Sequence, residues 1–205
     1  MRSSDMMDDE RDIEISGKET LHDGFFKMEL YRLRHRKFDG AWTEEVSREI
    51  FERGNSVAAL LYDPDADAVV MVEQFRLPAY LAGRPAWSVE TPAGVVKPGE
   101  ELADVARREA FEETGCEIVG DLRRISAFMA SIGGSTEIVT LFLGIVDSSK
   151  ASGIHGLEDE HEDIRVHVVS ALEAIRRSDE GEIDNAASII ALNWLARNRD
   201  GLRRG

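Results

Sequence analysis

Three glutamates stand where a helix would gather them on one side. Residues 100–115 have helical periodicity and end at a glycine, a natural helix stop. At about 100° per residue, Glu109, Glu112 and Glu113 fall within one arc of about 100°. Like charges at this spacing destabilise a helix by roughly 0.2–0.5 kcal/mol per pair, and a bound hard cation would offset that repulsion. The alternative is a solvated charged face that Arg107 and Arg108 compensate locally.

Beside the acidic arc the same helix carries small residues. Ala103, Ala106, Ala110 and Thr114 form a stripe that would let the helix backbone approach a sheet closely. The sequence therefore predicts a helix with a packing face and an acidic face next to each other.

The loop before the helix adds fixed spacing to this picture. Gly94 is followed after five residues by Glu100 and, after seven more, by Arg108-Glu109-Ala110-x-Glu112-Glu113-x-Gly115-Cys116. This string resembles, at every fixed position, the Nudix box, Gly-x5-Glu-x7-Arg-Glu-U-x-Glu-Glu-x-Gly-U with U apolar. The chain is therefore similar to the Nudix hydrolases.

Three further segments resemble the ADP-ribose pyrophosphatase branch of that family. They are the Glu-x-Pro-Ala-Gly string at 90–94, the acidic loop at 156–164 and the start of the last helix at 183–188. The similarity runs from about Glu19 to Leu195. One departure concerns the substrate class, because Ile132 stands in Ser-Ile-Gly-Gly where the branch usually has proline.

The resemblance implies a metal site and a proton acceptor. Mg²⁺, with Mn²⁺ as a substitute, prefers carboxylate and carbonyl oxygens. Two or three ions would be bound by Glu109, Glu113 and the backbone carbonyl of Ala93, with Glu112 and Glu162 completing the set. Glu160 matches the position of the general base, while the roles of Glu160 and Glu162 as base or ligand stay open. The residues assigned to catalysis are Glu160, Glu112 and Arg108, the last as the group that orients a box glutamate.

The same resemblance implies residues for the rest of the substrate. Phe25 would stack on adenine, and Arg48 and Arg76 would hold phosphate or the terminal ribose. Gly133, Gly134 and Glu137 would complete the substrate site. For Phe25 the alternative is a core residue, and for each arginine it is an ordinary surface position.

Composition excludes several partners. The 205 residues include 25 Lys+Arg and 40 Asp+Glu, for a formal charge of −15, which would repel nucleic acid and anionic lipid. The single cysteine excludes an internal disulfide and a multi-cysteine zinc site. Apolar stretches are far shorter than the roughly 18 residues of a membrane span, and the first ten residues are acidic rather than signal-like. We expect a cytoplasmic protein that binds a small nucleoside diphosphate sugar, no nucleic acid and no membrane.

Periodicity and turn signals outline the elements that must position these residues. Pairs of apolar strands, scattered helices and no repeats predict an α+β fold, a mixed α/β sandwich. The resemblance implies the Nudix α/β/α sandwich with a mixed sheet, preceded by an N-terminal antiparallel β subdomain. The expected strands are 25–33, 43–51, 57–62, 68–72, 87–90, 122–128, 137–146 and 164–169. The expected helices are residues 100–114, a helix that begins at residue 170, and residues 186–197. Residues 77–86 are expected to form a loop, and residues 92–99 no regular element.

We expect two regions and one reaction. Residues 1–55 would form a β region that dimerises two copies, and residues 56–205 the Nudix hydrolase domain. The reaction expected from the resemblance is Mg²⁺-dependent hydrolysis of ADP-ribose to AMP and ribose 5-phosphate. Two alternatives remain: a Nudix hydrolase of another nucleotide sugar such as GDP-mannose, and a non-catalytic module that senses ADP-ribose.

Overall fold

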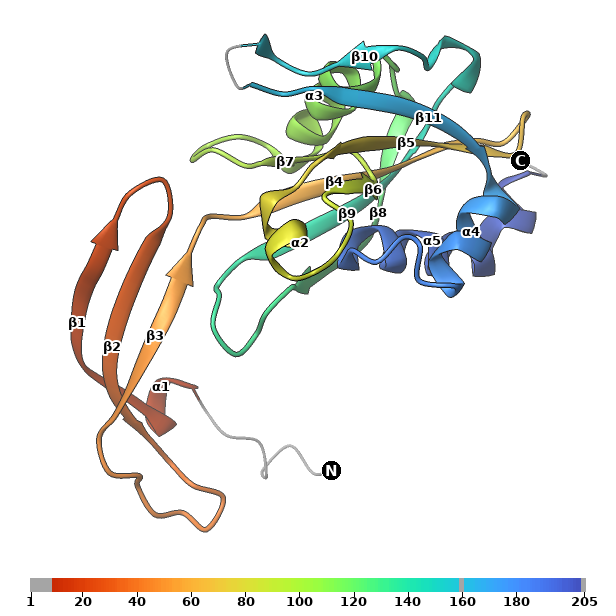
Figure 1. Cartoon of the computed structure of the whole chain (residues 1–205). Helices are drawn as coiled ribbons and strands as arrows, with labels where there is room; N and C mark the ends of the chain where they lie inside the picture. Colours follow the sequence, from red (N-terminus) through yellow and green to blue (C-terminus); the bar gives the residue numbers. More distant parts are fainter. Residues whose placement is uncertain (1–8, 159–160, 204–205) are drawn as a thin grey trace. The chain divides into compact units, whose positions relative to one another are not determined.

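The computed structural model describes residues 9–158 and 161–203 (Figure 1). They form two compact units. The first contains the described residues up to Gly54 together with Met129–Glu137, and the second contains the rest. Among the described helices, none is both long and apolar enough to cross a membrane.

The second unit is built on a mixed sheet of eight strands in the order β10-β11-β5-β4-β9-β8, with β6 beside β5 and β7 beside β4. The central strands β4 and β9 are parallel, whereas β5 pairs antiparallel with β4, β6 and β11. The strands are β4 (Ser56–Asp63), β5 (Ala68–Phe75), β6 (Trp87–Glu90), β7 (Ala93–Val95), β8 (Val119–Met129), β9 (Ile138–Ile145), β10 (Ile154–His155) and β11 (Ile164–Ser170).

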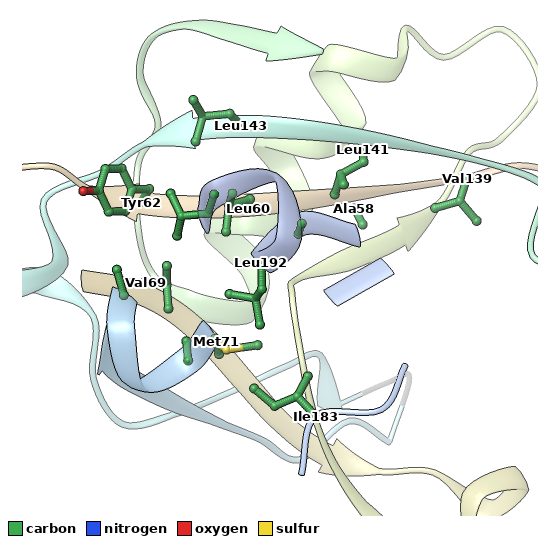
Figure 2. Packing of buried hydrophobic residues seen from close by; sticks show 14 residues of the cluster. Ala58, Leu60, Tyr62, Val69, Met71, Val139, Leu141, Leu143, Ile183 and Leu192 are labelled. Atoms are coloured by element: carbon green, nitrogen blue, oxygen red, sulfur yellow. The ribbon is translucent and has the colours of Figure 1, made fainter. Parts of the chain in front are cut away.

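Strand β4 is buried on both of its faces, which explains why its sequence is a continuous apolar run. Alternate residues such as Leu60 and Tyr62 pack in one cluster with Leu192 (Figure 2). The intervening residues, such as Ala59, pack in other clusters with residues of the acidic helix such as Ala110. Helix α3 (Leu102–Thr114) therefore covers one face of the sheet, and α4 (Ala171–Asp179) and α5 (Ala186–Leu202) cover the other. The expected α/β/α sandwich is confirmed.

Strand β4 pairs with a different neighbour at each of its ends, and the candidate site lies beside this change of partner. β4 pairs with β5 over residues 61–63 and with β7 over residues 56–58. The other end of β5 pairs with β6. The chain between β6 and β7 therefore crosses from the β5 arm of the sheet to the β4 arm. We call residues 91–92, which lie between these two strands, the crossing.

Two expectations about loops were wrong. Residues 93–95 form strand β7, because the first half of β4 offers them backbone partners once β5 has moved away. Residues 77–81 form the short helix α2 (Leu77–Leu81), with Pro78 in its first turn, where a missing N–H costs nothing. Helix α1 (Asp9–Asp12) and a 3₁₀ turn at Ser148–Lys150 are further helical segments among the described residues.

The first unit contains a separate antiparallel sheet. Strands β1 (Ile13–Asp23), β2 (Lys27–His35) and β3 (Val46–Glu52) pair in the order of the sequence. The expected N-terminal antiparallel sheet is confirmed. Strand β2 begins at Lys27 rather than at Phe25, because the chain bends over residues 24–26.

Candidate active site

The chain after the crossing lies directly against the acidic helix. The backbone N–H of Ala93 donates a hydrogen bond to the carboxylate of Glu113 at 3.1 Å. A Cβ at position 94 would lie only 2.1 Å from the carboxyl carbon of Glu109, so any other residue there would displace the Glu109 side chain. The first glycine of the box thus leaves room for the Glu109 side chain of α3 beside β7. Glu109, Glu113 and the Ala93 backbone are thereby gathered at one place.

Glu113 is the most deeply buried of the carboxylates described at this site. Its exposed fraction is only 3%. Burial raises the pKa of Glu113 to about 8; the hydrogen bond from Ala93 opposes this shift, and the charges of Glu109 and Glu162 add to it. Glu109 and Glu162 therefore lie close enough to repel the buried carboxylate of Glu113, while they themselves are only half-buried.

Arg108 lies among the other acids of the helix. Its guanidinium is 2.9 Å from the carboxylate of Glu109, 3.2 Å from that of Glu112 and 3.7 Å from that of Glu100. Glu100 in turn accepts a hydrogen bond from the backbone N–H of Lys97 at 2.7 Å, which ties the loop to the helix. This geometry suits the role expected for Arg108, because one cation holds two box glutamates in place.

The acidic loop brings Glu162 to the same cluster. The N–H of Leu157 donates to its carboxylate at 3.2 Å, and the N–H of Glu162 donates to the carbonyl of Leu157. Gly156 has a φ of +102°, and a Cβ there would come within 2.6 Å of the Cβ of Glu162. Glu160, the expected general base, lies outside the described residues, so its role stays a prediction.

Arg76 follows β5 and is held by a residue that the sequence analysis did not single out. Its guanidinium donates two hydrogen bonds to Glu90, from Nε at 3.0 Å and from Nη2 at 2.8 Å. Burial lowers the pKa of Arg76, but Glu90, followed by the charges of Glu113 and Glu162, raises it by more. Arg76 is therefore part of the electrostatic environment of the carboxylate cluster. The signal for Glu90 was its place at the start of the Glu-x-Pro-Ala-Gly string.

An open pocket of about 490 Å³ adjoins the Arg76–Glu90 pair. Its polar lining includes Arg84, Ser88 and Asp184, and the Nε of Arg84 donates to Asp184 at 2.7 Å. The pocket offers both donors and acceptors for a polar ligand.

The other residues expected to bind substrate lie in the first unit. Phe25 is 92% exposed, so it is not the core residue of the alternative interpretation, and its ring meets that of Phe26 edge-on at 4.7 Å. Glu137 is buried, and its carboxylate lies 3.6 Å from the guanidinium of Arg53, which stacks over the Phe26 ring. The structure therefore links Phe25 and Glu137 through two intermediate side chains.

The remaining three residues of that set occupy a turn and a strand. Gly133 and Gly134 lie in a turn whose Gly134 carbonyl accepts a hydrogen bond from the N–H of Phe51 at 2.7 Å. Arg48 lies on β3 opposite Tyr31, and its guanidinium donates to the neighbouring carbonyl of Ser47. Sequence reasoning missed Arg53, which lies just after β3.

The described side chains do not by themselves form a finished metal site. In residues 9–158 and 161–203, no group of three or more His, Cys, Asp or Glu side chains is arranged to hold an ion as it stands. The donors nevertheless suit a hard divalent cation, because Glu113 is a buried carboxylate that two neighbouring carboxylates repel.

Comparison with known proteins decides the family. The NUDIX domain model matches residues 52–191, which include β4 to the first turns of α5 and every carboxylate described above. The chain belongs to the Nudix family. ADP-ribose pyrophosphatase of Escherichia coli (strain K12) is 50% identical to this Nudix chain over 192 residues, which is 94% of the chain and 91% of the relative.

The identities of two further relatives differ according to the substrate for which each is named. ADP-ribose pyrophosphatase of Haemophilus influenzae (strain ATCC 51907 / DSM 11121 / KW20 / Rd) is 42% identical to the Nudix chain over 192 residues, covering 92% of the chain and 88% of the relative. GDP-mannose pyrophosphatase of Citrobacter koseri is 36% identical over 150 residues, covering 72% and 76%. The relatives named for ADP-ribose are thus more similar, and over more of the chain, than the one named for GDP-mannose.

Proposed function

We propose that this Nudix chain hydrolyses the pyrophosphate of ADP-ribose and releases AMP and ribose 5-phosphate. The observation that carries the proposal is the 50% identity to an ADP-ribose pyrophosphatase over nearly the full length of both proteins. The burial of Glu113 beside Glu109 and Glu162 supports hydrolysis rather than mere sensing of ADP-ribose, because a binder has no need to bury Glu113 against two other acids.

The proposed cofactor is Mg²⁺, with two or three ions per site and Mn²⁺ as a substitute. Glu109, Glu113 and the carbonyl of Ala93 would hold it, with Glu112 and Glu162 completing the set. When bound, the metal neutralises phosphoryl charge and lowers the pKa of a bound water. The fit rests on the repulsion around Glu113, which a divalent cation would replace by attraction.

The protein's own residues perform the remaining tasks. Glu160 would take the proton of the attacking water. Arg108 would keep Glu109 and Glu112 apart and oriented, through the contacts at 2.9 and 3.2 Å. Arg76, already oriented by Glu90, would bind a phosphate through its remaining N–H donors.

The adenosine and ribose ends of the substrate are assigned to the first unit. Phe25 would stack on adenine, with Arg48, Gly133, Gly134 and Glu137 around the rest. In this proposal residues 1–55 pair two copies of a cytoplasmic homodimer and lend these groups to the partner's site, while residues 56–205 carry the hydrolase domain. The exposure of Phe25 supports the stacking role, because an exposed ring is available to a ligand.

A second candidate substrate is GDP-mannose or another nucleotide sugar. The observation that favours it is Ile132, which is 83% exposed in the turn that also contains Gly133 and Gly134. A difference at an exposed turn position can change substrate preference without changing the fold.

A substrate panel with product identification separates these candidates. With Mg²⁺ present, we expect kcat/KM to be highest for ADP-ribose, with AMP and ribose 5-phosphate as products. A higher value for GDP-mannose would select the second candidate. Tight binding of ADP-ribose without release of AMP would make the protein a sensor.

The loop assignment has its own test. Glu160→Gln and Glu162→Gln should each lower turnover by about 10²- to 10⁴-fold, because each removes a group needed at the reacting atoms. Glu158→Gln is the matched control, since Glu158 is an exposed acid of the same loop. Unchanged turnover in both variants would remove the acidic loop from the mechanism.

A further inference from the structure

The crossing lacks ordinary strand partners at the point where the site needs it to be rigid. The β5–β6 ladder ends at Glu90 and the β4–β7 ladder resumes at Ala93. Between them, the carbonyl of Pro92 accepts a hydrogen bond from the N–H of Ala59 at 2.9 Å. The N–H of the buried Thr91 has to find its partner elsewhere, because a buried N–H without one is costly.

That partner comes from the first turn of α5. The hydroxyl oxygen of Ser188, whose exposed fraction is 0%, accepts the hydrogen bond from the N–H of Thr91 at 2.9 Å. Its own backbone N–H donates to the side-chain oxygen of Asn185 at 3.0 Å. A helix residue about 100 positions away in the sequence thus replaces a missing sheet partner.

Asn185 has two tasks at once. Its Oδ1 caps α5, and its Nδ2 donates a hydrogen bond to the carbonyl of Val89 in β6 at 3.0 Å. The chain from Val89 to Ala93 is therefore held by α5 on one side and by β4 and Glu113 on the other. Capping alone would not require the second hydrogen bond, because serine or aspartate caps a helix equally well.

We propose that Asn185 and Ser188 are positioning residues for the metal site. They hold the crossing so that the carbonyl of Ala93 and the carboxylate of Glu113 keep the spacing that a divalent cation needs. The inference rests on the metal requirement of the proposed function. Groups that orient metal ligands typically account for a 10- to 100-fold difference in metal affinity.

The test measures Mn²⁺ affinity, by the electron paramagnetic resonance signal of free Mn²⁺, in the full-length protein without substrate. Asn185→Ser keeps the helix cap but loses the donor to Val89. Ser188→Ala removes the acceptor for Thr91. We expect Mn²⁺ affinity to fall about 3- to 10-fold in Asn185→Ser and about 10-fold or more in Ser188→Ala.

Ser170→Ala is the matched control. Ser170 caps α4 by accepting a hydrogen bond from the N–H of Glu173, and its cap lies on a helix that does not hold the crossing. This variant should lower the melting temperature while leaving Mn²⁺ affinity within 2-fold of wild type. A loss of affinity that merely follows lost stability would appear in the control as well and would overturn the proposal.

Wild-type affinity in both Asn185→Ser and Ser188→Ala would also overturn it. If Ser188→Ala does not fold, Asn185→Ser decides alone, because its cap is retained. A wild-type protein that binds no Mn²⁺ would end the inference together with the proposed metal. One that binds Mn²⁺ but releases no AMP from ADP-ribose would end the proposed reaction and leave the affinity comparison valid.

Discussion

The two sheets of this chain are stabilised in opposite ways. Every residue of β4, the central strand of the large sheet, is buried. Strand β1 of the small sheet is exposed along its length except at Gly17, which is half-buried. Its links to β2 include exposed ion pairs, Glu19 with Arg32 and Glu14 with Arg34. Burial of apolar surface is the larger source of stability, so the large sheet is the more rigid platform.

This difference separates two kinds of chemistry. The carboxylate cluster, in which Glu109 and Glu162 repel Glu113, is built on the large sheet. The expected contacts to the organic part of the substrate are on the small sheet and the turn beside it. A buried carboxylate such as Glu113 is tolerated where apolar burial is extensive, because its cost is a small part of that total.

The largest difference between the two sheets should come from a glycine substitution in each, Gly94→Ala in the large sheet being the damaging one. A Cβ at this position overlaps the carboxyl group of Glu109, so the glutamate or the β7 backbone has to move. Misplacement by about 1 Å near reacting groups can cost about 10²-fold, and we expect kcat/KM for ADP-ribose to fall by at least that factor.

Gly17→Ala is the matched control in the small sheet, because a Cβ there meets atoms of Arg32 only at ordinary distances of 3.7 Å or more. Its kcat/KM should stay within 2-fold of wild type. Equal losses in the two variants would mean that both sheets constrain the reaction alike, and the comparison would fail.

Glu113→Gln should separate stability from activity. Glutamine keeps an oxygen to accept the hydrogen bond from Ala93 but cannot ionise. Because burial raises the pKa of Glu113 to about 8, wild type has to take up a proton on folding at pH 7.5, and glutamine removes that cost. In EDTA at pH 7.5 we expect the variant to be more stable than wild type by about 1–3 kcal/mol in urea unfolding, and to be nearly inactive with Mg²⁺. A variant with a lower free energy of unfolding than wild type would show that the ionisable group of Glu113 does not destabilise the metal-free protein.

Local pattern predicted most of the large sheet and the helix beside it. The expected strand at 87–90 coincides with β6, and the helix expected to end before Gly115 does so, with φ of +71° at that glycine. Each depended on residues that are adjacent in the sequence, such as a glycine stop or an apolar run. Strand β7 was missed because its pairing depends on β5 leaving β4, which no local pattern records.

The site shows the same limit. Fixed spacing within one helix located Glu109, Glu112 and Glu113, because 3.6 residues per turn determines which of them share a face. It could not locate Ser188, whose partner Thr91 is 97 positions away. Nor could it foresee that Arg76 would be held by Glu90, since both lie at strand ends whose alignment is set by sheet register. Tertiary pairing, not residue type, supplied these contacts.

Asp67→Asn tests a charge pair at the turn between β4 and β5 of the large sheet. The carboxylate accepts hydrogen bonds from Arg199, at 2.7 Å from Nε, and from Tyr62 at 2.9 Å. The hydrogen bond from Arg199 is the main cause that lowers the pKa of Asp67. Asp67 has a φ of +53°, which asparagine tolerates, so the variant isolates the charge. We expect a loss of about 1–2 kcal/mol at pH 7.

The pH dependence of that loss follows from the direction of the shift. Because the pKa of Asp67 is lower in the folded than in the unfolded protein, its stabilisation is present above pH of about 4 and disappears as pH falls through the folded value. The difference between wild type and variant in urea unfolding should therefore be constant from pH 7 to 5 and shrink below pH 4. A difference that grows towards acidic pH would contradict the assignment.

The smallest effect should come from Glu14→Gln, which removes an ion pair of the small sheet. Glu14 and Arg34 are 2.7 Å apart, the same distance as that between the Nε of Arg199 and Asp67. Their side chains, however, are 52% and 50% exposed, against 19% and 17% for Asp67 and Arg199. Water and salt screen the exposed pair, so we expect a loss below about 0.5 kcal/mol that vanishes at high ionic strength. Urea unfolding at low and high salt measures both properties. A loss as large as that of Asp67→Asn, unchanged by salt, would mean that distance rather than burial sets the strength of these pairs, and that the two sheets are stabilised alike.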